Sequence, residues 1–98
     1  MNTGITVQNN MNVINASFRV VITKFSDNEY IAEIPSIKHC IVSGETIEEA
    51  MRYINEVLDA MLEVMQEDGT PIPNDSNLIE YSITKQLPNT LAQQLETA

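Results

Sequence analysis

The chain has 98 residues, which is the usual length of one domain, and its fourteen acidic residues outnumber five basic ones to give a net charge of −9. Such a surface repels phosphate, so the composition excludes a domain that binds nucleic acid by itself. No apolar run approaches the ~20 residues of a membrane span, and the N-terminus does not have the pattern of a secretory signal. A single cysteine allows no internal disulfide, which is typical of a cytoplasmic protein.

The first half of the chain predicts three strands after a flexible, Asn-rich arm over residues 1–15. Short β-branched and alternating runs place these strands at about 17–25, 30–34 and 39–43. The sequence Ser26-Asp-Asn-Glu29 has turn chemistry, so the first two strands should form an antiparallel hairpin.

The segment from 46 to 69 predicts one long helix. Thr46 can cap its start by accepting from the Glu49 amide, while the Glu49 carboxylate reaches back to the Thr46 amide. Gly69 can take the left-handed position that ends a helix, and two prolines follow it closely.

The apolar arc of this helix covers roughly 200°, which is more than one sheet face needs. One explanation is that loops fold over its flank. The other is that Tyr53, Ala60 and Val64 form an interface with a second copy of the chain.

After a loop over 70–77, the run Leu78-Ile-Glu-Tyr-Ser-Ile83 predicts a fourth strand with Ile79, Tyr81 and Ile83 on one face. Residues 85–98 form a tail in which 89–96 can make two helical turns. The order is therefore β-β-β-α-β, an α+β fold in which one long helix packs on a small antiparallel sheet.

A search for catalytic chemistry finds no site. His39 and Cys40 are adjacent in a predicted strand, so their side chains point to opposite faces and cannot share a metal or a proton. The glycines are too far apart for a phosphate loop, and no carboxylate of the first strand faces the helix acids. We therefore predict no enzyme activity, no catalytic or metal-binding residues and no cofactor.

Three stretches together resemble the HicB antitoxin family: Glu29-Tyr-Ile-Ala-Glu-Ile-Pro35, Val42-Ser-Gly-Glu-Thr-Ile-Glu-Glu-Ala50 and Glu67-Asp-Gly-Thr-Pro-Ile-Pro73. The resemblance runs from Phe18 to about Ser76 and suggests a HicB-like domain over 16–84. It implies a partial ribonuclease-H-like fold without the nuclease site, in a bacterial type II toxin–antitoxin system.

Members of this family neutralise HicA, a small basic ribonuclease that cleaves mRNA, by binding it directly, and they commonly form homodimers or homotetramers. The resemblance therefore implies a HicA-type toxin as the partner. Exposed acids that could meet its basic residues lie in the first hairpin and on the helix: Asp27, Glu29, Glu33, Glu56, Asp59 and Glu63. The alternative function is a solitary, self-assembling HicB-like domain with another binding or scaffold role.

The sequence departs from the family pattern in two places. Where the family usually has Leu-Pro-Gly-Cys before the third strand, this chain has Ile37-Lys-His-Cys40. Many family members also carry a C-terminal DNA-binding domain, whereas the tail here is short and has Lys85 as its sole base, so we predict no direct contact with DNA.

Overall fold

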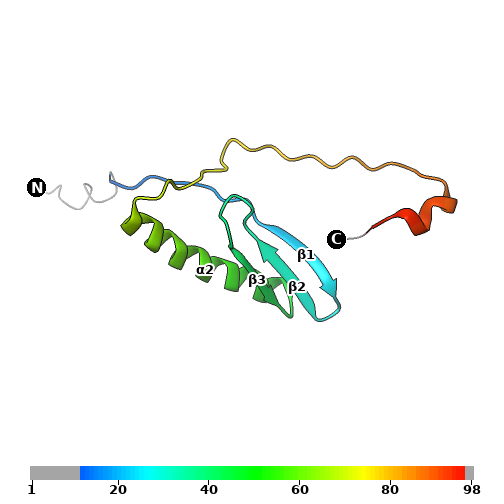
Figure 1. Cartoon of the computed structure of the whole chain (residues 1–98), viewed down its shortest axis with the longest axis horizontal. Helices are drawn as coiled ribbons and strands as arrows, with labels where there is room; N and C mark the ends of the chain where they lie inside the picture. Colours follow the sequence, from blue (N-terminus) through cyan, green and yellow to red (C-terminus); the bar gives the residue numbers. More distant parts are fainter. Residues whose placement is uncertain (1–11, 97–98) are drawn as a thin grey trace, which may run out of the picture.

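The structure, a computed structural model, describes residues 12–96. Strands β1 (Val21–Ser26), β2 (Glu29–Glu33) and β3 (Ile41–Gly44) form an antiparallel sheet in that order. Helix α2 (Ile47–Asp68) lies across one face of this sheet (Figure 1). The predicted α+β class is confirmed. Residues 1–11 of the predicted arm lie outside the described part of the chain.

The β1–β2 hairpin turns within the predicted segment Ser26–Glu29, but the turn itself is only Asp27 and Asn28, because Ser26 already pairs with Glu29. The Asn28 N–H donates to Ser26 Oγ at 3.3 Å. The first strand was predicted from residue 17, but β1 begins only at Val21. The Ser17 N–H instead donates to the Asn74 side chain at 3.0 Å, and the Arg19 N–H donates to the Asp75 carboxylate at 2.9 Å. Side chains of the loop after α2 thus occupy the place that a neighbouring strand would take.

The loop between β2 and β3 consists of two consecutive turns. The Ile37 N–H donates to the Ile34 carbonyl at 3.0 Å, the Cys40 N–H donates to the Ile37 carbonyl at 3.2 Å, and the Ile34 N–H donates to the Cys40 carbonyl at 2.9 Å. His39 has a φ of 67°, so the third residue of the second turn is left-handed. The predicted strand over 39–43 therefore starts too early, because these turns hold His39 and Cys40 outside β3.

Helix α2 begins and ends where predicted. Thr46 Oγ1 accepts from the Glu49 N–H at 3.0 Å, but the Glu49 carboxylate accepts from the Glu45 N–H at 2.7 Å rather than from that of Thr46. At the C-terminus Gly69 has a φ of 72°, and the N–H groups of Gly69 and Thr70 both point to the Met65 carbonyl. The bond from Thr70 is the 6→1 bond of a Schellman motif, the bond from Gly69 is the 5→1 bond of the αL motif, and both depend on the left-handed conformation that glycine adopts freely.

The core lies between α2 and the sheet. Its buried members come from β2, from the following loop and from the first two turns of the helix: Ala32, Ile34, Ile37, Cys40, Ala50 and Ile54. Gly44 allows the helix to approach closely, because a Cβ at this position would lie 2.6 Å from the Ala50 nitrogen. Phe18, Val20 and Ile22 pack against this core but remain only half-buried.

The predicted fourth strand over 78–83 is wrong for the isolated chain. These residues are extended but pair with no strand among the described residues. They leave the body and lead to a short 3-10 helix, η1 (Asn89–Gln94), where the sequence predicted two helical turns (Figure 1). The radius of gyration is consequently 19.3 Å, whereas a compact chain of this length has about 13 Å.

Candidate protein-binding surfaces

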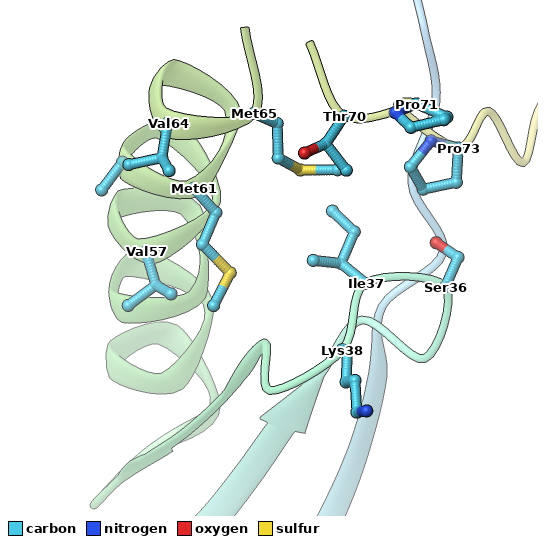
Figure 2. A pocket seen from close by; sticks show the side chains of 11 residues that line it. Ser36, Ile37, Lys38, Val57, Met61, Val64, Met65, Thr70, Pro71 and Pro73 are labelled. Atoms are coloured by element: carbon cyan, nitrogen blue, oxygen red, sulfur yellow. The ribbon is translucent and has the colours of Figure 1, made fainter. Parts of the chain in front are cut away.

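An apolar groove of about 590 Å³ lies beside the C-terminal half of α2. One wall is the helix, and the other walls are the two loops that flank the core. Figure 2 shows Met65, Thr70 and Ile37 pointing into the space between these elements. Three elements line the groove: Val57, Ala60, Met61, Val64 and Met65 of the helix, Ser36, Ile37 and Lys38 of the β2–β3 loop, and Thr70, Pro71 and Pro73 of the loop after α2.

The groove is suited to an apolar side chain of a partner protein. Methionine has three rotatable bonds and a polarizable sulfur, so Met61 and Met65 can adapt to the shape of what enters. Val64 is 54% exposed, so a large aliphatic side chain is left to solvent at the rim. An apolar groove with an exposed aliphatic side chain at its rim is therefore a candidate contact surface for a partner protein.

Two of the three residues predicted to form an oligomer interface line this groove, namely Ala60 and Val64. Tyr53 lies two turns nearer to the N-terminus on the same helix face, where its ring sits 5.1 Å from the Arg52 guanidinium. Together with Val57 these residues form one stripe, which we call the apolar flank: Tyr53, Val57, Ala60 and Val64. One of the two explanations offered for the wide apolar arc was that loops fold over this flank, and the structure has two loops beside it. The sequence did not indicate which loops these are, because their approach depends on the tertiary fold.

Acidic residues border the apolar flank. Relative to Ala60, Glu56 comes four residues earlier, Glu63 three residues later and Glu67 seven residues later. At these spacings the three glutamates form the row of side chains next to the apolar flank. We call these three residues the acidic rim. The two ion pairs found within residues 12–96 are Arg19–Glu80 and Lys24–Asp27, so neither neutralises the rim. An apolar centre with a charged border is the usual anatomy of a protein interface.

The predicted partner-binding acids do not form one surface. Glu56 and Glu63 belong to the rim, and Asp59 is next to both of them on the side away from the apolar flank, three residues after Glu56 and four before Glu63. Glu29 and Glu33 alternate with the buried Ala32, so they lie on the sheet face that α2 does not cover.

Two of the hairpin acids already have partners within the chain. Asp27 is 3.4 Å from the Lys24 ammonium, and the Glu29 carboxylate accepts from Ser43 Oγ at 3.1 Å. A basic partner would compete with these contacts, whereas at the rim it would meet carboxylates that the described residues leave without a base. The rim is therefore the more accessible acidic surface.

The residues considered for catalysis are not arranged for it. Cys40 is buried, and its burial raises the pKa of the thiol, although a backbone hydrogen bond from Ile34 opposes the shift. His39 is exposed in the adjacent turn. Across residues 12–96 no three His, Cys, Asp or Glu side chains gather closely enough to hold a metal ion. Nor is any helix in that range long and apolar enough to cross a membrane.

Comparison with known proteins gives a consistent picture. A UPF0150 protein of Synechocystis, ssr1258, is 42% identical over 53 residues, which cover 54% of this chain and 77% of that protein. A UPF0150 protein of Thermoplasma acidophilum, Ta0767, is 32% identical over 59 residues, or 60% of this chain and 86% of that protein. No solved structure gives a significant match. The family model described as the HicB_like antitoxin of bacterial toxin-antitoxin system matches residues 18–93, and the chain therefore belongs to the HicB-like antitoxin family.

Proposed function

We propose that this protein is the antitoxin of a type II toxin–antitoxin pair and neutralises a HicA-type, mRNA-cleaving toxin in the cytoplasm by binding it directly. The observation that carries the proposal is the match of residues 18–93 to an antitoxin family. A toxin is the class of partner that such membership implies. Binding requires no catalytic group on the antitoxin, so the role is non-enzymatic.

The electrostatics of α2 favour a basic partner. The helix carries seven acidic residues and one basic residue, and no base lies in its last turn. The C-terminal end of a helix has a partial negative charge of its own, and Glu67 and Asp68 add to it. A basic protein is attracted to this end and approaches faster at low salt.

We further propose that the toxin docks on the apolar flank and the acidic rim together. An apolar side chain of the toxin enters the groove between Val64 and Ile37, while basic residues meet Glu56, Glu63 and Glu67. An interface with a second copy at Tyr53, Ala60 and Val64 was one of two explanations for the wide apolar arc, and it stays a prediction. Two copies meeting here would oppose one acidic rim to another, so like-charge repulsion favours the basic toxin.

The test is co-expression with a small basic HicA-type toxin, taken from the reading frame next to this chain's gene where one is encoded there. Rescue of growth and co-purification of a complex that weakens with salt are expected. Val64→Glu should abolish the complex, because it places a charge in the apolar groove, and Glu63→Lys should weaken it and reduce its salt dependence. Glu96→Lys makes the same charge change in the tail and serves as the matched control.

Two results would contradict the proposal. A toxin that remains active despite co-expression would show that it is not neutralised by this chain. Unchanged binding by Val64→Glu would remove the flank from the interface even if the antitoxin role holds. Charge reversal at Glu33 in the same assay tests the acids on the opposite sheet face, and a loss of binding there would assign the contact to the hairpin.

A further inference from the structure

The C-terminal segment that leaves the folded body exposes several large apolar side chains. Along residues 78–83, Ile79 is 75% exposed, Tyr81 is 90% exposed and Ile83 is 82% exposed. In an extended chain these three alternate side chains share one face. A soluble protein rarely leaves such a regular apolar face uncovered, so the segment requires a partner surface.

The free edge of β1 is a matching surface. The sheet order is β1-β2-β3, so β1 pairs only with β2 and no strand in the described part of the chain lies on its outer side. An open edge presents unpaired N–H and C=O groups that accept a further strand. β1 has six residues, as does the segment 78–83, and the half-buried side chains of Phe18 and Ile22 would be covered by a strand added at this edge.

The chain is built so that the segment turns away from its own β1. Asp75 is held against the start of the sheet, because its N–H donates to the Ser17 carbonyl at 2.7 Å and its carboxylate accepts from the Arg19 N–H. A turn follows at once, in which the Leu78 N–H donates to the Asp75 carbonyl at 2.9 Å and Asn74 Oδ1 accepts from the Ser76 N–H at 3.1 Å. In Figure 1 the chain beyond this turn runs clear of the sheet.

We propose that residues 78–83 pair with the free β1 edge of a second copy of the chain, and that the second copy returns the same contact. The result is a two-fold dimer held by reciprocal strand exchange, which needs no new surface on either copy. Each sheet gains the fourth strand that the sequence predicts. The Arg19–Glu80 ion pair at 2.7 Å joins the third residue of the exchanged segment to its own body.

Charge selects a second copy over a basic toxin as the occupant. Residues 78–88 contain one acid, Glu80, and one base, Lys85, so this segment has no net charge. β1 carries Lys24 and no acidic residue. Two copies can therefore meet here without opposing their acidic surfaces, whereas the acidic rim remains free for a toxin. The inference does not depend on the antitoxin role.

Mass measurement over a wide range of protein concentration tests the dimer. The wild-type chain should be dimeric, and Tyr81→Glu should raise the dimer dissociation constant about a hundredfold, since each dimer contains the substitution twice. Ser82→Glu adds the same charge on the opposite face and should change it much less. Because Tyr81 is exposed in the single chain, circular dichroism should show an intact fold in both variants.

Cross-linking identifies which surfaces meet. A Thr23→Cys chain and a Ser82→Cys chain are mixed with a short bismaleimide, which leaves the buried Cys40 unmodified. Cross-links that join one chain of each kind support the exchange. Cross-links that join only two Ser82→Cys chains, a wild-type monomer at every concentration, or a dimer that tolerates Tyr81→Glu would each overturn it. So would hydrogen-exchange protection of residues 79–83 in a monomer, which would mean that the segment folds back onto its own sheet.

Discussion

Replacing His39 by glycine should stabilise the protein. His39 has a φ of 67°, and the turn that it completes is closed by the hydrogen bond from the Cys40 N–H to the Ile37 carbonyl. A left-handed residue is strained when it has a Cβ, and glycine removes that strain. The family pattern Leu-Pro-Gly-Cys has glycine at the position of His39. This chain therefore keeps the turn with a residue that is less stable in it.

The magnitude follows from two opposing terms. A left-handed conformation costs a non-glycine residue ~1–2 kcal/mol. Glycine in turn gives the unfolded chain more freedom, which costs ~0.5–1 kcal/mol. The difference between the two terms is centred at ~0.75 kcal/mol, so the free energy of unfolding of His39→Gly should rise by about that amount and the thermal midpoint by about 3–6 °C for a domain of this size.

Denaturation by heat and by urea, followed by circular dichroism at one fixed protein concentration, measures the effect. A fixed concentration matters because self-association changes the apparent stability. His39→Ala is the matched control, since it removes the imidazole but keeps the Cβ, and it should give no gain. Equal stabilisation by alanine and glycine would refute the argument, because the histidine side chain and not the backbone would then be the source of the strain.

Two further predictions concern the core. Gly44→Ala should lower the free energy of unfolding by about 1–3 kcal/mol, because its Cβ would lie 2.6 Å from the Ala50 nitrogen and push α2 off β3; a urea titration with no change would contradict this close approach. Cys40 should make stability fall at alkaline pH. Its folded-state pKa is raised, so the stabilisation is complete below the unfolded value near 9.0 and is lost as pH rises through the folded pKa. In Cys40→Ala this alkaline loss should disappear from unfolding curves measured at a series of pH values, and a persistent loss would assign it to another group.

The elements that local chemistry determines were predictable. The caps of α2 at Thr46 and Gly69 and the hairpin turn within Ser26–Glu29 all appear where the sequence predicts them. The conformation of residues 78–83 was not predictable in the same way. Their alternation shows that one face must be buried, but it does not show which surface buries that face. The left-handed turn at His39 was hidden for a related reason, since neither Lys38 nor His39 carries the Pro-Gly signal of such a turn.

The candidate site was predicted only in part. Periodicity found Ala60 and Val64 on an apolar flank and Glu56 and Glu63 beside it, because one helix determines both. The loops that turn this flank into a groove come from elsewhere in the chain, and only the fold brings them to the helix. The acids of the hairpin and the helix were grouped by charge, whereas the sheet separates them onto opposite faces.

The contacts at Asn74 and Asp75 have a consequence for the order of folding. Within the body, β1, β2, β3 and α2 each contact the element that is next in sequence, so they can form quickly through short loops. The hydrogen bond from Ser17 to Asn74 joins residues 57 apart and needs the body in place before it can close. The direction of the C-terminal segment is therefore set last, and a newly made chain acquires its fold before it can offer a strand to another copy.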